Sequence, residues 1–320
     1  MDRIRISNDA TYFPVSLTDV MLAAPLLSRL LLGATLPGKV LQLAALGAYS
    51  VSALQDWADR RGIRRIDFLA EFGADLRHLR PMSTEQRAHE VRTLAQRLNR
   101  EYIAETLPRP ELARLVDHHL TNYIASITGQ RVETSAEVRN FGLAQLLFPF
   151  ALGACDFLSG DIAIFRDTGV FEPHVIAHEF CHRKGYHKEL EAQVLAYLAL
   201  VSSGEPLLVQ AALCERLHRH VRVLSEEDEE RFEQILVSAE LRDELREQMM
   251  ELRPRTSALA GPVADLMRKL YDERMKLTGQ NGLSDYDRGF TDFLHTFENS
   301  PDARQPVPRG ARPEESTRAA

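Results

Sequence analysis

The sequence predicts a mainly α-helical protein, an α+β fold with only a small strand element. Apolar residues recur at helical spacing through most of the chain, whereas only Asp161–Phe165 alternates in part like a strand. Ser159–Gly160 and Asp167–Gly169 bound that stretch, as turn residues bound a strand. With 320 residues, 44% of them hydrophobic, the chain is large enough to bury a substantial core.

The composition predicts that the chain is divided into three regions. Residues 1–80 form an N-terminal helical region with an apolar hairpin over 20–54, residues 81–299 form the main domain, and residues 300–320 are expected to be disordered. Arg29 interrupts the first apolar segment of the hairpin, and Pro37–Lys39 separate it from the second. We therefore expect a buried or surface-associated hairpin, with peripheral membrane association, and keep a transmembrane hairpin as the alternative.

Helices account for most of the remaining chain. Ser83-Thr84-Glu85-Gln86 indicates the N-terminus of a helix, and Pro108 and Pro110 end that helix. In chain order the predicted helices are 55–80 with a break at Gly62, 84–106, 110–127, 173–184, 188–203, 205–223, 226–252, 257–277 and 284–297.

Charge and cysteine content narrow the functional classes. The net charge of −7 disfavours nucleic-acid binding, which depends on clustered Lys and Arg. Cys155, Cys181 and Cys214 are too few and too scattered for a disulfide framework, and no secretory signal opens the chain. We therefore expect a cytoplasmic protein, with inner-membrane association as the alternative.

The segment His178-Glu179-Phe180-Cys181-His182 has the chemistry of a zinc site. On a helix, histidines four residues apart share one face and can bind one Zn²⁺, while Glu179 can take a proton from a metal-activated water. Gly185 follows closely enough to end this helix with a left-handed residue. Isolated histidines such as His218 and His220 are expected to be solvated.

A catalytic zinc site needs a third protein ligand, and a carboxylate from the next helix suits that role. Glu189 and Glu191 are both close enough in sequence. Because two helical residues are about 200° apart, only one of them can face the metal.

Two blocks of the chain resemble the bacterial DUF3810 family, whose members are expected to be zinc metallopeptidases. The first is HVIAHEFCHRKGYHKELEAQVLAYLALVSSGEPLL, residues 174–208, and the second runs from Leu270-Tyr271-Asp272 through Lys276 and Gly279-Gln280 to Ser284-Asp285-Tyr286. The resemblance extends unevenly over 140–297. Gln193 stands where the family usually has Asn, and Phe148–Cys155 only partly follows the family pattern.

The resemblance implies a zincin-like, gluzincin-type site. His178, His182 and Glu189 are then the ligands of one Zn²⁺, with Glu191 as the alternative third ligand, and Glu179 is the catalytic base. Tyr286 is the candidate donor to the oxyanion, whereas Tyr197 is more consistent with helix packing. Zincins also place an edge strand above the active-site helix, and residues 161–166 occupy that position in the sequence.

The function predicted from these observations is a zinc-dependent hydrolase, most consistent with a metallopeptidase that acts on a peptide or protein substrate. The alternative is a non-catalytic helical interaction or regulatory protein with a structural or vestigial zinc site. The two differ in whether Glu179 lies free beside the metal or is held in a salt bridge.

Overall fold

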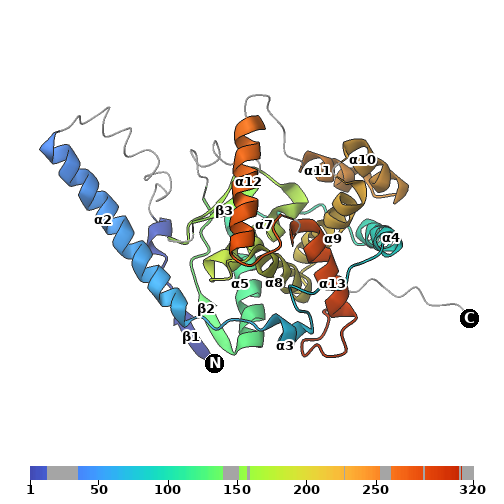
Figure 1. Ribbon diagram of the computed structural model, residues 1–320, viewed down its shortest axis with the longest axis horizontal. Helices are drawn as coiled ribbons and strands as arrows, with labels where there is room; N and C mark the ends of the chain where they lie inside the picture. The colour runs from blue at the N-terminus through green and yellow to red at the C-terminus, as the bar shows by residue number, and fades with distance from the viewer. Residues whose placement is uncertain are drawn as a thin grey trace, which may run out of the picture.

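The computed structural model describes residues 1–12, 35–139, 151–156, 159–226, 228–252, 261–283, 285–309 and 311. Over these residues the protein is mainly helical with a few short strands, as predicted (Figure 1). In chain order the elements are β1 (Asp2–Arg5), η1 (Asp9–Tyr12), α2 (Leu36–Asp59), η2 (Arg60–Gly62), α3 (Phe68–Phe72), α4 (Thr84–Arg100), α5 (Arg109–Thr128), β2 (Gln130–Glu133), β3 (Gly153–Cys155), β4 (Ile162–Ile164), η3 (Gly169–Phe171), α7 (Glu172–Arg183), α8 (Glu189–Ser202), α9 (Pro206–Ser225), α10 (Glu229–Ser238), α11 (Asp243–Glu251), α12 (Gly261–Leu277), η4 (Asp285–Gly289) and α13 (Phe290–Glu298).

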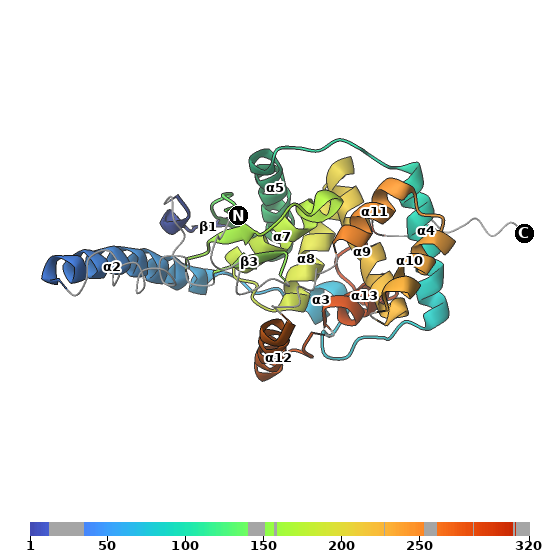
Figure 2. The ribbon, with the colours of Figure 1, turned by 90° about the horizontal axis from the view of Figure 1, so that it is seen from above.

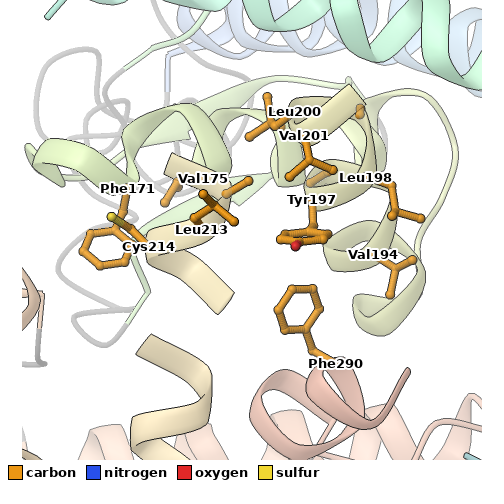
Figure 3. Close-up of a cluster of buried hydrophobic side chains, with 14 of the residues drawn as sticks. Phe171, Val175, Val194, Tyr197, Leu198, Leu200, Val201, Leu213, Cys214 and Phe290 are labelled. Atoms are coloured by element: carbon orange, nitrogen blue, oxygen red, sulfur yellow. The ribbon is translucent and has the colours of Figure 1, made fainter. Parts of the chain in front are cut away.

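Helix α8 forms the centre of the core. It is buried on all sides from Ala192 to Val201, as expected for an apolar helix surrounded by others, and it packs against α5, α7, α9 and α13. Tyr197 of α8 faces Phe290 of α13, with ring centroids 5.5 Å apart (Figure 3). This packing fixes the start of α8 relative to α7, and both helices carry candidate site residues.

Strand β4 lies between two partners and is not the edge strand that the sequence suggested. It pairs antiparallel with β3 on one side. On the other side the Arg139 amide donates to the Ile162 carbonyl (2.7 Å), and the Ile164 amide donates to the Arg139 carbonyl (3.1 Å). Among the described residues of this sheet, β4 therefore has a partner on each side and β3 pairs with β4 alone.

A second pair of strands joins the N-terminus to the domain body. β1 runs parallel to β2, with Asp2 opposite Gln130 and Arg5 opposite Glu133. The sequence did not predict this pair, because each strand has only four residues and their partners lie far apart in the chain.

The predicted N-terminal hairpin is described only in its second half. Residues 36–59 form one helix, α2, which projects away from the rest of the molecule in both ribbon views (Figures 1 and 2). Leu43, Val51 and Leu54 are exposed along it. The first apolar segment, up to residue 34, lies outside the described residues. None of the described helices combines the length and hydropathy that crossing a bilayer requires.

Two predicted helices are shorter or divided in the structure. The helix expected over 55–80 is replaced by the end of α2, extended chain and the five-residue α3, which Asp67 caps by accepting the Ala70 amide. The helix expected over 226–252 is divided into α10 and α11. Glu240 adopts a positive φ of 54° between them, and the Asn99 side chain hydrogen-bonds to the Glu240 carbonyl and the Arg242 amide.

The beginning of the expected disordered tail is packed against the domain. The amides of Arg304 and Gln305 donate to the Glu71 carbonyl, and the Ala311 carbonyl accepts from the buried Arg216 guanidinium (2.6 Å). Ala303 and Val307 add apolar contacts to the core. Residues 312–320 lie outside the described residues.

Candidate metal centre

Helix α7 carries the two histidines and Glu179. Pro173 lies in its first turn, where a missing amide costs nothing, and Arg109 forms an ion pair with Glu172 at 2.6 Å. Phe180 and Cys181 are buried in the core. Packing of this apolar side fixes the orientation of the opposite face, which presents His178 and His182.

A tight turn after α7 returns the chain toward the histidines. Gly185 adopts a positive φ of 93°, as predicted from its position after the motif. Nδ1 of His182 donates to the Tyr186 carbonyl (2.8 Å), which leaves Nε2 of the neutral ring as the metal-binding nitrogen. Helix α8 then begins at Glu189.

Three ligand atoms converge at this point. Nε2 of His178 lies 3.2 Å from Nε2 of His182 and 3.1 Å from Oε2 of Glu189, and the last two atoms are 3.5 Å apart. Atoms that bind one zinc ion tetrahedrally at about 2.0–2.1 Å lie about 3.3 Å from one another. Both the spacing and the donor types therefore fit a zinc ion with three protein ligands.

In the absence of a metal ion, a proton bound by His182 lets this histidine and the Glu189 carboxylate attract each other. Burial lowers the pKa of His182, but the Glu189 carboxylate opposes this and raises it to about 9. Burial likewise opposes ionisation of Glu189, yet His182 and His178 keep the pKa of that carboxyl well below its usual range. A metal ion that binds here must displace the proton, so binding releases protons at neutral pH.

The alternative candidates lie elsewhere. Glu191 points away from the histidines and forms an ion pair with Lys188 at 3.3 Å. Tyr197 is buried in the core, where its hydroxyl accepts from Arg216 (3.3 Å). The expectation that His218 and His220 are solvated is wrong, because both are buried within α9.

Glu179 is buried beside strand β3. A Cβ atom added at Gly153 would come within 2.9 Å of the Glu179 Oε1 atom, so the absence of a side chain at Gly153 makes room for this carboxylate. Burial raises the pKa of Glu179, and His178 and His182 oppose that effect. Among the described residues, no Lys or Arg forms an ion pair with Glu179. Sequence reasoning did not identify Gly153.

The second sequence block meets the first at Glu189. The Tyr271 hydroxyl donates to Oε1 of Glu189, and the Gln280 side-chain oxygen accepts the Glu189 amide at 2.8 Å. Tyr286 lies at the same place, with its hydroxyl 3.5 Å from that of Tyr271 and its ring centroid 6.4 Å from that of His178. Tyr286 had been predicted near the site. Tyr271 and Gln280 had not, although both lie in the block that carries the family resemblance.

A partly buried ionic cluster holds the turn that carries Tyr286. This turn, η4, is π-helical, a conformation that often occurs at functional sites. Asp287 forms ion pairs with Arg219 (2.8 Å) and Arg222 (3.0 Å) of α9. The Arg219 guanidinium also lies 5.8 Å from the centre of the Tyr286 ring, so α9 fixes the position of this tyrosine.

Comparison with known proteins supports the resemblance noted in the sequence. Residues 168–294 match the model of the family described as a protein of unknown function (DUF3810). The matched stretch contains His178, Glu179, His182, Glu189 and the second sequence block, but not Gly153. No curated protein and no solved structure matches the chain.

Proposed function

We propose that this protein is a zinc-dependent hydrolase, and that its substrate is a peptide or protein. The observation that carries the proposal is the convergence of two imidazole nitrogens and one carboxylate oxygen at 3.1–3.5 Å, next to a second, buried carboxylate. Two histidines with one glutamate form a common ligand set of catalytic zinc sites.

In this proposal, His178, His182 and Glu189 hold the zinc and Glu179 is the general base. Zinc bound there supplies Lewis-acid chemistry, which lowers the pKa of a water molecule to about 7. Glu179 accepts the proton of the attacking water and delivers it to the leaving amine. Its position one residue after His178 keeps the carboxylate next to the ligand face of α7.

Two further groups fit peptide hydrolysis. Tyr286 is our candidate donor to the oxyanion, because its ring lies beside His178 and burial keeps its hydroxyl protonated by raising its pKa. The face of β3 at Gly153 packs against Glu179, so a peptide bound next to this strand would lie close to the base. The preference for a peptide over a small substrate rests on the family resemblance.

The state of Glu179 favours the catalytic alternative over a vestigial site. A glutamate left over in a structural metal site has no reason to be kept buried, because burial of an unpaired carboxylate is costly. In the described part of the chain Glu179 has no cationic side chain as an ion-pair partner, and Gly153 provides the room it occupies.

Metal analysis of the full chain tests the proposal. We expect about one zinc per chain in the wild type after dialysis and a clear loss in His178→Ala. The control His118→Ala, at an exposed position on α5, should retain zinc. A wild-type protein that binds no zinc contradicts the proposed site. A zinc-loaded wild type that cleaves no member of a peptide library contradicts the hydrolase assignment.

A further inference from the structure

We propose that Tyr271 is a positioning residue that restricts Glu189 to one-oxygen ligation and thereby keeps a coordination position open for water. The inference rests on the proposed zinc site. It gives Tyr271 a role on a metal ligand, in addition to the role proposed for Tyr286 as donor to the oxyanion.

The two oxygens of the Glu189 carboxylate have different partners. Oε2 faces both histidines, at 3.1 Å from His178 Nε2 and 3.5 Å from His182 Nε2. Oε1 points to the other side and accepts the Tyr271 hydroxyl proton. One oxygen is therefore directed at the metal position, and the other is occupied by a neutral donor.

The direction of the Tyr271 hydrogen bond follows from the surroundings. A tyrosine hydroxyl ordinarily keeps its proton at neutral pH, and here it lies on Oε1 of Glu189. An ionised carboxylate can only accept, which makes Tyr271 the donor. A tyrosine has one such proton. The Tyr286 hydroxyl lies 3.5 Å from the Tyr271 hydroxyl and is a further neighbour of the Glu189 carboxylate.

One-oxygen ligation matters for the chemistry. Carboxylates bind metals through one or two oxygens, and a catalytic zinc site with three protein ligands keeps its fourth position for water. If Oε1 were free, the carboxylate could rotate and bind through both oxygens, which would compete with the water. Hydrogen bonds to ligating carboxylates restrict such rotation and tune the affinity for the metal.

The backbone of Glu189 is held from the same segment. Gln280 accepts the Glu189 amide at 2.8 Å, at the start of α8, where an amide has no partner within the helix. Tyr271 and Gln280 therefore fix the side chain and the main chain of one ligand. The two contacts come from the end of α12 and the loop after it, a segment that stands at the edge of the molecule in Figure 2.

Zinc affinity and metal geometry in Tyr271→Phe test the inference. We expect the zinc dissociation constant, measured by chelator competition, to rise about 10–100-fold, as is typical when a partner of a metal ligand is removed. With Co²⁺ in place of zinc, the visible spectrum should shift toward the weaker absorption of a higher coordination number. Tyr286→Phe should lower kcat about 100–1,000-fold.

Tyr197→Phe is the matched control, because it also removes a buried tyrosine hydroxyl, but one that contacts Arg216 and not Glu189. Its zinc affinity and Co²⁺ spectrum should equal those of the wild type. Circular dichroism and the unfolding midpoint of each metal-free variant identify any loss of folding. Equal zinc affinity in wild type and Tyr271→Phe overturns this inference and leaves the zinc site standing, whereas a wild type without zinc overturns the proposed function itself.

Discussion

Glu179 and Glu189 are two buried glutamates within one site, and their surroundings shift their pKa values in opposite directions. Glu189 faces two imidazoles, which keep its pKa well below the usual range against the effect of burial. For Glu179 the effect of burial prevails over that of the histidines, and the pKa is raised. One glutamate is therefore suited to hold a cation, whereas the other is suited to accept a proton.

Replacement of Glu179 by Gln separates these two roles. The amide has the same shape but cannot accept the proton, so we expect kcat to fall about 100–10,000-fold, with zinc content unchanged. Hydrolysis of the best peptide substrate and metal analysis measure the two quantities. Glu191→Gln, on the same helix as the ligand Glu189, should keep full activity. Equal activity of Glu179→Gln and wild type would remove Glu179 from the mechanism.

At the residue scale, the sequence predicted the part of the site that depends on local spacing. His178, Glu179 and His182 lie within one helical turn and a half, so their relative positions follow from helix geometry. The choice of Glu189 over Glu191 required the family resemblance, since either residue alone could face the metal. Tyr271 and Gln280 could not be placed, because their contacts with Glu189 span 82 and 91 residues.

Among the secondary-structure elements, β3 and the turn after α7 determine the shape of the site. Strand β3 approaches α7 closely only because Gly153 lacks a side chain. The turn at Gly185 lets α8 begin within reach of α7. Each of these glycines lends itself to a direct test.

Gly153→Ala should reduce activity without removing the metal. The new methyl group would lie 2.9 Å from the Glu179 Oε1 atom and 3.1 Å from the Ala163 carbonyl oxygen, so the Glu179 carboxylate must move. We expect kcat/KM to fall at least about tenfold, since small displacements of a catalytic group are costly, while zinc content stays the same. Ala154→Gly, on the opposite face of β3, is the control. Loss of zinc in Gly153→Ala would indicate general disruption instead.

Gly185→Ala should destabilise the protein and weaken zinc binding. Its φ of 93° disfavours any side chain, and a Cβ would lie 3.2 Å from the Ile63 Cδ1 atom. Gly204 has a positive φ of 71° with nothing within 4 Å of the added Cβ, so Gly204→Ala isolates the conformational cost of about 1 kcal/mol. In urea titrations, Gly185→Ala should lose more unfolding free energy than Gly204→Ala. Only Gly185→Ala should raise the zinc dissociation constant.

At this scale, periodicity predicted most of the helices and missed features that depend on distant contacts. The alternating stretch correctly indicated β4, but its assignment as an edge strand was wrong because Arg139 pairs with its second side. The π-helical turn at η4 is held by arginines of α9, which no local pattern reveals. Positive φ at Glu240 divides the helix that was predicted as continuous over 226–252.

Considered as a whole, the molecule buries histidines that the sequence indicated as solvated. Burial and the neighbouring Arg219 lower the pKa of His218 to about 3, and burial and Arg216 keep the pKa of His220 well below its usual range. In the unfolded chain both regain a pKa of about 6.5. Unfolding below pH 6.5 therefore takes up protons, and stability is lost as the pH falls through this range.

The contribution of His218 to this pH dependence can be measured. The histidine should make the metal-free protein about 2 kcal/mol less stable at pH 5 than at pH 7.5, because only the unfolded state binds its proton there. In His218→Gln the difference in unfolding free energy between the two pH values should shrink by about that amount. His118→Gln, at an exposed position, is the control. An unchanged pH difference in His218→Gln would show that His218 is not held neutral.

The segment from residue 300 onward shows that composition alone does not predict whether a segment is ordered. Residues 300–309 have few apolar side chains of their own, yet their amides find acceptors on the Glu71 carbonyl and a buried arginine binds the carbonyl of Ala311. Backbone hydrogen bonds and ion pairs to a preformed surface order a segment that could not form a core by itself.

The contacts at Glu189 also set an order of events during synthesis. His178, His182 and Glu189 leave the ribosome together, but the chain must grow by another 91 residues before Gln280 can reach the Glu189 amide. Helices α9–α11 lie between the two sequence blocks. They must therefore be synthesised before the hydrogen bond between Gln280 and Glu189 can form. In the proposed zinc site, the second set of contacts to the ligand Glu189 would thus form late in synthesis, when the segment that carries Tyr271 and Gln280 docks.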